Sequence, residues 1–415
     1  MEASVAFPLL PADRAILALE CETIAGHTCK VVRLAPGAPD IEAIRARIEE
    51  RIAAVPELER RLGTSGALPA WVPEGAFDIE RRVVPLDGAA TLPADEIPAA
   101  VARIFAERLD RDQPLWRIDV APLDDGGAVL IWRIHHALAD GTATMRFARG
   151  LLWDQADAAA VVRAEADAHR DDQRRHGHLA AMLEREFAES AHRSPFDGTI
   201  GTSRRVSLAT VPLGPLHEAA RERAGATLND AVLSVLAGSL RRWLEKHHGS
   251  LRGIRVRVPV SLHHEGDAVA NLDSFFSLRM PLTVADPVER LRAVRRETRR
   301  RKAAHDAEEL REFLDELGSA SPRMRALAER IEASPRSFAL SVSNVPGPRG
   351  PVTVLGTPVR AIHSIAEIGE RHALRVAVVS LAGSLHFGFC ADPAIVDDLD
   401  AMAVGVEREA AELIG

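Results

Sequence analysis

The chain of 415 residues has no tyrosine, three cysteines and few aromatic side chains, 4% in all. Cys21, Cys29 and Cys390 are too few for a disulfide framework, which favours a reducing, cytoplasmic environment. No apolar stretch reaches the roughly 18 residues of a membrane-spanning helix, so any membrane contact is expected to be peripheral. The first 20 residues lack a basic start followed by a continuous apolar core, and we therefore expect no signal peptide.

Charge and length limit the kind of partner and the number of domains that we expect. Acidic residues outnumber Lys and Arg by 60 to 52, and a formal net charge of −8 gives no general reason to expect a nucleic-acid partner. The composition, 47% hydrophobic and 27% charged, is typical of a globular protein. Single cores rarely grow beyond about 250–300 residues, so this length predicts two substantial cores.

Helical and strand periods alternate along the chain, which predicts a mixed α/β class. Apolar residues recur every three or four positions over 41–52 and 101–109, and both are expected helices. Two apolar runs flank the turn "DDGG" and predict a hairpin over 116–134. We divide the chain into an N-terminal lobe (1–156), a charged helical crossover (157–200) and a C-terminal lobe (201–415).

The C-terminal lobe repeats the alternation of strands and helices. A helix is expected over 227–247, capped near Thr227 and Asn229, and a closing helix from about Ile395. The expected strands are 204–211, 254–262, 274–282, 337–345 and 374–381, the last of which forms a hairpin with the residues up to 390.

Two adjacent histidines, His135 and His136, end the hairpin's second strand. Successive residues of a strand point to opposite faces, so one imidazole is expected to face a cavity and the other the packed interior. An imidazole titrates near working pH and is suited to act as a general base. Two alternatives stand beside this one: two packed histidines at a strand end, and a metal site, for which no further His or Cys cluster has a completing spacing.

Asp140 and Gly141 lie four and five residues after His136. The Asp140 carboxylate is expected either to orient a histidine or to form an ion pair with Arg255 or Arg257. Gly141 is expected to permit a backbone conformation closed to other residues, and a helix is expected near Thr142, capped by its hydroxyl. The chain has no GxSxG stretch, which argues against a hydrolase with a serine nucleophile.

Two further segments stand out. "SNVPGP" (343–348) predicts a rigid turn, which on its own is typical of a structural loop. The segment 289–305 carries eight basic residues, and it is either a solvated helix face or a contact for a phosphate-bearing cofactor or an anionic lipid surface.

Taken together, these motifs resemble the bacterial wax ester synthase/diacylglycerol acyltransferase family. That family is grouped with chloramphenicol acetyltransferase and peptide-synthetase condensation domains as CoA-dependent acyltransferases. The resemblance covers nearly the whole chain and rests on five motifs in the family's order. They are HHxxxDG (135–141), Pro114-Leu115-Trp116, Asn229-Asp230, Pro259-Val260-Ser261 and the "SNVPGP" element.

The resemblance implies a two-lobed chloramphenicol-acetyltransferase-like fold, each lobe a mixed sheet with flanking helices, and an active-site tunnel between the lobes. It implies that His136 is the general base, that His135 is its structural partner, and that Asp140 pairs with Arg255. The other implied site residues are Gly141 in the catalytic motif, Asn271, Asn229 and Asp230 as structural or oxyanion support, and Pro114, Leu115, Trp116, Ser261 and Asn344 as tunnel candidates. No metal and no permanently bound cofactor are implied, and acyl-CoA is the co-substrate.

The implied activity is esterification of a fatty alcohol or diacylglycerol without an acyl-enzyme. The implied location is the cytoplasm, with peripheral association to the inner membrane face or lipid droplets. The chain departs from the family at His263, where arginine is usual, at Ala270, where glycine is usual, and at Arg82, where histidine is frequent. An acyltransferase for a short-chain or polar acceptor and a non-catalytic lipid-binding homologue therefore stay open as alternatives.

Overall fold

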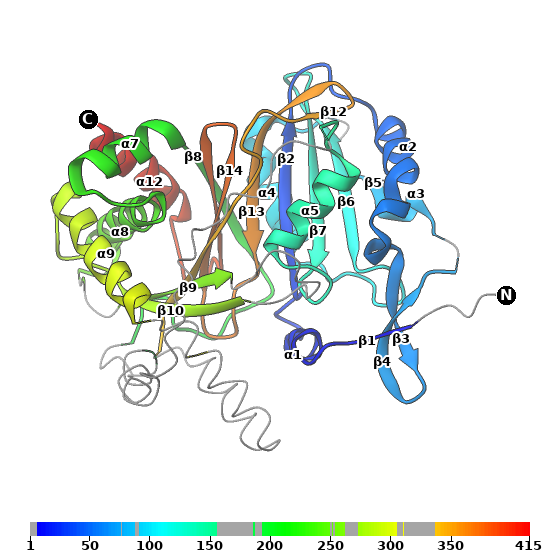
Figure 1. Ribbon diagram of the computed structural model, residues 1–415, viewed down its shortest axis with the longest axis horizontal. Coiled ribbons are helices and arrows are strands. Elements are labelled where there is room, and N and C mark those ends of the chain that lie inside the picture. Colours follow the sequence, from blue (N-terminus) through cyan, green and yellow to red (C-terminus); the bar gives the residue numbers. More distant parts are fainter. Residues whose placement is uncertain are drawn as a thin grey trace.

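Two mixed β-sheets stand side by side, with helices against their outer faces (Figure 1). The structure is a computed structural model and describes residues 6–75, 77–87, 91–155, 186, 193–249, 251, 254–261, 273–304, 310 and 337–415. The two sheets confirm the predicted mixed α/β class with two lobes. Most of the predicted crossover, residues 157–185 and 187–192, lies outside the described residues, and the predicted lobe boundaries stay predictions.

The first sheet contains six of the described strands, and β5 at its edge runs parallel to β6 while the other neighbours are antiparallel. In spatial order its strands are β12 (Thr353–Val354), β13 (Thr357–Ala366), β2 (His27–Leu34), β7 (Ala128–His135), β6 (Trp116–Pro122) and β5 (Val83–Pro85). The predicted hairpin is confirmed, because β6 and β7 pair from Trp116 opposite Ile134 to Pro122 opposite Ala128.

Helices cover both faces of this sheet, which explains why β7 reads as a nearly continuous apolar run. Ile131 packs in one cluster with α4, and Leu130 and Trp132 pack in the other with α2 and α5. The helices of this lobe are α1 (Pro11–Leu19), α2 (Ile41–Arg51), α3 (Ile79–Arg82), α4 (Ile97–Phe105) and α5 (Gly141–Leu151), with 3₁₀ turns at Ile52–Ala54, Pro56–Glu59 and Ala94–Glu96. A small third sheet joins β1 (Phe7–Pro8), β4 (Leu68–Pro73) and β3 (Arg60–Ser65).

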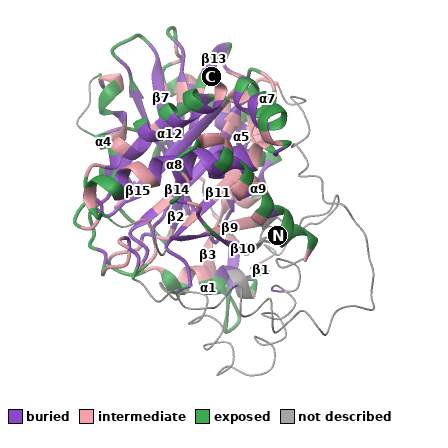
Figure 2. Cartoon of the chain, turned by 90° about the vertical axis from the view of Figure 1, so that its left-hand side faces the viewer, coloured by how far each residue is buried: buried purple, intermediate pink, exposed green. Residues whose placement is uncertain are grey.

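The second sheet confirms the strands expected in the C-terminal half. In spatial order they are β10 (Asp273–Arg279), β9 (Arg255–Ser261), β11 (Leu340–Val345), β14 (Leu374–Leu381), β15 (Ser384–Ala391) and β8 (Arg205–Pro212). The helices beside it are α7 (Leu213–Ala224), α8 (Leu228–His247), α9 (Pro287–Ala303) and α12 (Leu399–Ile414), and Figure 2 shows the largely buried α8 and α12.

The ends of these helices follow local chemistry. Thr227 caps α8 as predicted, in a capping box with Asp230. The closing helix starts at Leu399, later than predicted from Ile395, because the Asp392 carboxylate binds the backbone N–H of Ala394 and Asp398 takes a left-handed φ of 47°. The residues before Leu399 therefore form a turn.

The two sheets are connected by β13, which lies late in the sequence. It pairs antiparallel with β2 of the first sheet, with His363 opposite Val31, and it packs against β14 and β15 of the second. The sequence places this segment in the lobe 201–415, but the structure assigns it to the sheet of the first lobe. The two lobes are thus joined by β13, which pairs with β2 beside the histidine-bearing strand β7.

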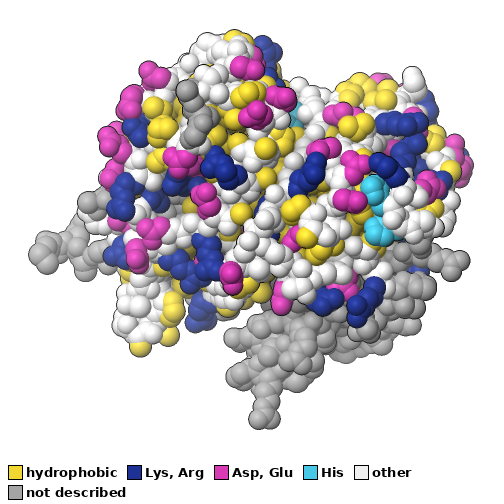
Figure 3. All heavy atoms as spheres, turned by 180° about the vertical axis from the view of Figure 1, so that it is seen from behind, with side chains coloured by type: hydrophobic (Ala, Val, Ile, Leu, Met, Phe, Trp, Pro, Cys, Tyr) yellow, Lys and Arg dark blue, Asp and Glu magenta, His cyan; other side chains and the backbone are white. Residues whose placement is uncertain are grey.

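Basic and acidic side chains are interspersed over the face that Figure 3 shows, in agreement with the modest net charge. The predicted basic segment forms most of α9, whose Arg290 and Arg301 are buried in ion pairs with Glu409 and Glu186. Arg296, Arg299 and Lys302 of the same helix are exposed. The solvated and the ligand-binding interpretations of this exposed face both stay open.

Candidate active site

The HHxxxDG segment forms a short turn between β7 and α5 that is held by backbone hydrogen bonds. His135 donates its N–H to the carbonyl of Leu115, and His136 donates to the carbonyl of Gly26, both at 2.9 Å. Leu138 and Ala139 both donate back to the carbonyl of His135. The turn is therefore fixed against the start of β6 on one side and the start of β2 on the other.

His135 is the buried member of the pair, with 1% of its surface exposed. Its Nδ1 accepts from the N–H of Ala137 at 3.1 Å, which leaves Nε2 as the nitrogen that can donate. Nε2 lies 3.4 Å from a carboxylate oxygen of Glu20. Burial raises the pKa of Glu20, but hydrogen bonds from His135 and Arg111 outweigh it and hold that pKa below its ordinary value. His135 is therefore enclosed and held on both ring nitrogens, and its implied role as structural partner of His136 stays a prediction.

Gly26 leaves the space that the His135 ring occupies. Its φ of 72° is in the left-handed region, and a Cβ atom there would lie 2.6 Å from Nε2 of His135. Any larger residue would be strained and would collide with the ring.

His136 is only partly buried. Burial lowers its pKa to about 4, and the positive charge of Arg375 lowers it further in the same direction. Its Nδ1 is enclosed and has no hydrogen-bond partner among the residues that the structure describes. At neutral pH the ring is therefore uncharged, with a lone pair available to take a proton.

Arg375, on β14, belongs to the second sheet and reaches His136 through a short chain of contacts. It donates to the carbonyl of Glu367 at 3.0 Å, and the Glu367 carboxylate accepts from the N–H of Ala25 at 3.0 Å. Arg204 binds the same carboxylate at 2.9 Å and also donates to the carbonyl of Thr23. The buried Glu367 therefore joins the second lobe to the segment that ends at Gly26, beside His136.

A second cation near the HHxxxDG turn is Lys30 of β2. It is 2% exposed, its Nζ donates to the hydroxyl of Ser364 at 2.7 Å, and burial lowers its pKa to about 8. The charge of Lys30 acts on both His136 and Asp140.

Asp140 is the N-cap of α5, and its carboxylate accepts from the N–H of Ala143 at 2.6 Å. The predicted cap at Thr142 is therefore wrong. The Asp140 side chain reaches the free N–H groups of the first turn from the N-cap position, whereas Thr142 already lies inside the helix.

Gly141 corrects a second expectation. Its backbone is not in the left-handed region, so conformational freedom is not what the site needs there. A Cβ at Gly141 would lie 2.7 Å from Cγ2 of Val345, the last residue of β11. The requirement is space, and the contact shows that the structure brings HHxxxDG and "SNVPGP" together.

The structure gives contacts for several of the other predicted residues. Leu115 and Trp116 are completely buried, and the Trp116 indole donates to the carbonyl of Leu58 at 2.8 Å. Asn229 is partly buried at the start of α8, and Asp230 also accepts from the Thr298 hydroxyl at 2.6 Å, which ties α8 to α9. The roles of Pro114, Ser261 at the end of β9 and the partly buried Asn344 in lining a tunnel stay predictions.

Arg255 and Arg257 lie on β9. Arg255 donates to the carbonyl of Glu186 at 3.4 Å, and Arg257 stacks over the rings of Phe275 and Phe338 at 3.8 Å each. The pair between Arg255 and Asp140 stays a prediction. Asn271, His263 and Ala270 lie outside the described residues.

In the described part of the chain, no three His, Cys, Asp or Glu side chains gather closely enough to hold a metal ion. None of the helices described there has the length and apolar character to cross a membrane.

The amino-acid sequence was compared with models of known protein families. A model of the wax ester synthase/diacylglycerol acyltransferase catalytic domain matches residues 9–189, and a model of the C-terminal domain of the same family matches residues 270–413. Together the two matches cover more than three quarters of the chain. The chain belongs to this family. Membership confirms the predicted enzyme class, an O-acyltransferase of the wax ester synthase/diacylglycerol acyltransferase type.

Individual relatives and solved structures agree with this family assignment. The chain is 28% identical to a protein named as a probable diacylglycerol O-acyltransferase of Mycobacterium tuberculosis, over 91% of this chain and 89% of the relative. Among solved structures it is similar to a wax ester synthase/diacylglycerol acyltransferase from Marinobacter aquaeolei, with 23% identity, 98% of each chain covered and a TM-score of 0.72. It is also similar to the first condensation domain of the calcium-dependent antibiotic synthetase, with 18% identity, 100% and 96% coverage and a TM-score of 0.67. Both structures confirm the predicted two-lobed acyltransferase fold.

The prediction from sequence missed the residues that surround the two histidines in this family member. Glu20, Gly26, Lys30 and Arg375 each contact or act on the HHxxxDG turn from a distant part of the chain. Gly26, next to a strand that begins with His27, was the one visible signal, because an isolated glycine beside a strand often marks a close approach. Nothing local in the sequence marks Arg375.

Proposed function

We propose that this protein transfers the acyl group of an acyl-CoA to the hydroxyl group of a long-chain alcohol or a diacylglycerol, with His136 as general base. The acceptor is supported by the family to which the chain belongs and by the names of its mycobacterial relatives. The donor is supported by a related fold, the starter condensation domain of rhizomide synthetase, whose structure was determined in complex with C8-CoA.

The observation that carries the proposal is the state of His136. Its ring lies at the junction of the two lobes, partly buried, with its pKa lowered to about 4. His135 cannot take this role, because its Nδ1 accepts from Ala137 and its Nε2 faces Glu20. Of the two histidines, His136 alone combines an uncharged ring with access to a substrate.

The reaction then needs no covalent enzyme intermediate. Nε2 of His136 takes the proton of the acceptor hydroxyl while the oxygen attacks the thioester carbonyl. When the tetrahedral intermediate collapses, the carbon–sulfur bond breaks and the thiolate takes the proton from His136, so that an ester and free CoA leave. This course agrees with the absence of a GxSxG serine from the sequence.

The intermediate carries a negative charge on the former carbonyl oxygen, and donors aimed at that oxygen lower the barrier. Asn271 is the donor that the family resemblance implies. The charges of Arg375 and Lys30 provide a positive potential at the same place, since both act on His136. His135, Glu20 and Gly26 act as positioning residues for the turn.

One observation favours a second candidate, an acceptor that is short or polar. Lys30 and Arg375 place two cations near the base, and charged groups are unusual beside an acceptor that is wholly apolar. A lipid-binding homologue without turnover is the third possibility and differs from both because it would release no CoA.

The test is the release of free CoA from palmitoyl-CoA by the purified protein, followed with a thiol-reactive dye, with hexadecanol, dioleoylglycerol, a short alcohol or no acceptor. We expect release that depends on hexadecanol or dioleoylglycerol, and mass spectrometry should find the matching ester. Release with the short alcohol alone would replace the lipid acceptor by a polar one. No release with any acceptor would contradict the proposed enzyme and leave the binding protein.

A further inference from the structure

A cleft of about 440 Å³ opens at the edge of the first sheet, and its lining includes Arg133, two residues before His135 on β7. Its walls come from α3 and β5, from the segment that follows α4, and from β6 and β7. Five arginines and three carboxylates line it. We call it the arginine cleft after Arg81, Arg82, Arg108, Arg117 and Arg133, and the carboxylates are those of Glu80, Glu107 and Asp110. Its volume lies in the range of small-molecule sites in proteins.

Three of these arginines have carboxylate partners. Arg133 and Arg117 both bind Asp119, at 3.0 and 2.9 Å, and Arg108 lies 3.8 Å from Glu20. These three guanidinium groups are neutralised at least in part by the protein itself.

Arg81 and Arg82 differ, because neither forms an ion pair with any residue that the structure describes. Arg81 is exposed, whereas Arg82 is 7% exposed. One nitrogen of Arg82, Nη1, donates to the carbonyls of Pro114 and Trp116, at 2.7 and 3.1 Å. Its Nε and Nη2 donate to none of the described residues.

Carbonyl oxygens satisfy hydrogen bonds but do not neutralise a charge. A buried cation without a directly paired anion is unfavourable. Burial, followed by the charge of Arg81, lowers the pKa of Arg82 to about 10, although the charges of Asp110 and Glu74 act in the opposite direction. The Pro114 and Trp116 carbonyls also hold the guanidinium plane in place, so its remaining donors are already oriented. Such a fixed fork is suited to an anion with several oxygens.

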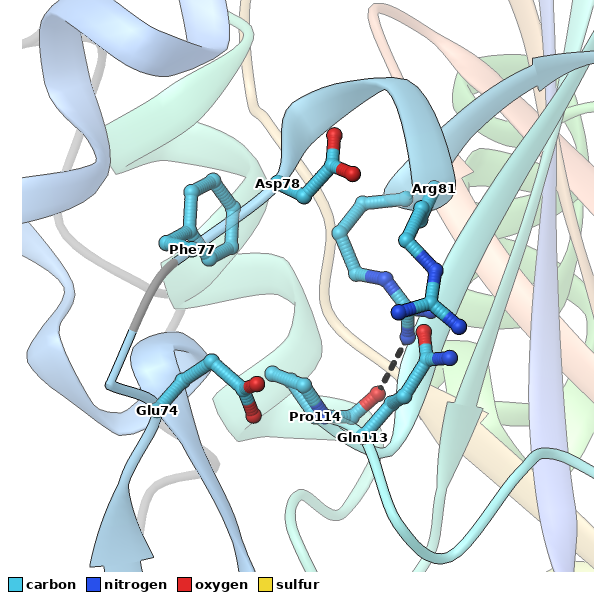
Figure 4. A pocket seen from close by; sticks show the side chains of 7 residues that line it. Glu74, Phe77, Asp78, Arg81, Gln113 and Pro114 are labelled. Carbon is cyan, nitrogen blue, oxygen red and sulfur yellow. Dashed lines mark hydrogen bonds between the residues drawn. The ribbon is translucent and has the colours of Figure 1, made fainter.

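Figure 4 shows the hollow that adjoins the cleft and shares Arg81, Arg82 and Gln113 with it. The side-chain ends of Arg81 and Gln113 point toward one another there, and the dashed line marks the hydrogen bond accepted by Pro114. Gln113 donates to the Asp110 carboxylate at 3.0 Å, which fixes its amide. Phe77, stacked against Trp116, forms an apolar side of the same hollow.

We propose that the arginine cleft binds a small molecule bearing a phosphate or pyrophosphate group, which Arg81 and Arg82 hold together. The group belongs either to the nucleotide end of a CoA molecule or to a separate phosphorylated metabolite. The chemistry recognised is the same in both cases.

The probe is inorganic pyrophosphate, titrated calorimetrically into the wild-type protein, Arg81→Gln, Arg82→Gln and Arg360→Gln. Arg360 is an exposed arginine on β13 that lies outside the cleft. We expect wild type and Arg360→Gln to bind with a Kd below about 1 mM, and Arg81→Gln and Arg82→Gln to bind about tenfold more weakly or worse. Arg81→Gln carries the test if Arg82→Gln lowers the melting temperature, because the side chain of Arg81 is exposed and only its backbone N–H, which the substitution keeps, donates to the Asp78 carbonyl.

CoA is then added as a competitor. If CoA displaces pyrophosphate, the cleft binds the nucleotide end of CoA. If pyrophosphate is retained, the cleft binds a separate phosphorylated molecule. Either result supports the site. The proposal is overturned if pyrophosphate does not bind up to about 10 mM, or if Arg81→Gln binds it as well as wild type does. The titration needs no turnover, so its failure would leave the proposed acyl transfer untouched.

Discussion

At the scale of single residues, the two histidines differ through their neighbours. His135 is enclosed by Gly26, Glu20 and the N–H of Ala137, whereas His136 is partly open and close to the charge of Arg375. The sequence pointed to His136 through the motif that it shares with the family. It did not point to Arg375, because that residue is 239 positions away and is brought near only when the two sheets pack.

The lowered pKa of His136 predicts the pH dependence of turnover. His136 acts as a base only when neutral, so kcat/KM should stay high as the pH falls below 6.5 and be lost as it passes through about 4. Replacing Arg375 by Met removes a positive charge that disfavours the imidazolium. The pKa of His136 should then rise, and the acidic limb of the profile should move to higher pH.

The measurement is a pH profile of kcat/KM for wild type, Arg375→Met and the control Arg360→Gln. Melting temperatures at each pH separate titration of the base from unfolding. An acidic limb near 6.5 in the wild type would contradict the lowered pKa of His136, and a limb that stays in place in Arg375→Met would contradict the effect of the Arg375 charge on it.

At the scale of elements, periodicity predicted many of the helices and strands correctly, but it predicted neither β2 nor α7. α2, the hairpin of β6 and β7, and the capped α8 follow from patterns within a short stretch of chain. The errors were local too. The cap of α5 was assigned to Thr142 when Asp140 forms it, and the need for Gly141 was assigned to backbone freedom when it comes from a neighbouring strand.

The contact between Gly141 and Val345 predicts a rescue. Gly141→Ala places a methyl group 2.7 Å from Cγ2 of Val345, which is too close for two carbon atoms. It should therefore lower the free energy of unfolding by about 1–3 kcal/mol and displace the HHxxxDG turn, with loss of turnover. The double variant Gly141→Ala with Val345→Ala removes the collision and should recover part of both. Urea denaturation and the CoA-release assay measure the two effects.

Gly214→Ala is the matched control, because a Cβ there would meet nothing within 4 Å and its backbone is not left-handed. It should leave stability and turnover close to wild type. If the double variant were no better than Gly141→Ala alone, the packing explanation of Gly141 would be wrong.

At the scale of the whole molecule, the site exists because segments far apart in sequence meet. β2 and β7 supply Lys30 and the histidines, β14 supplies Arg375, and β13 crosses from the second half of the chain into the first sheet. The buried pair of Arg204 and Glu367 closes the junction beside Gly26. Composition and periodicity predicted two lobes, but they could not predict this exchange, since a late strand that joins an early sheet has no local signature.

The central claim is that His136 takes the acceptor's proton, and the most direct test is acceptor-dependent CoA release by His136→Ala compared with wild type and Arg360→Gln. Circular dichroism and melting temperature show that the variant is folded. We expect wild type and Arg360→Gln to release CoA only with an acceptor, and His136→Ala to lose this release by about 10²-fold or more. A folded His136→Ala protein that still esterifies the acceptor at near the wild-type rate would contradict the account.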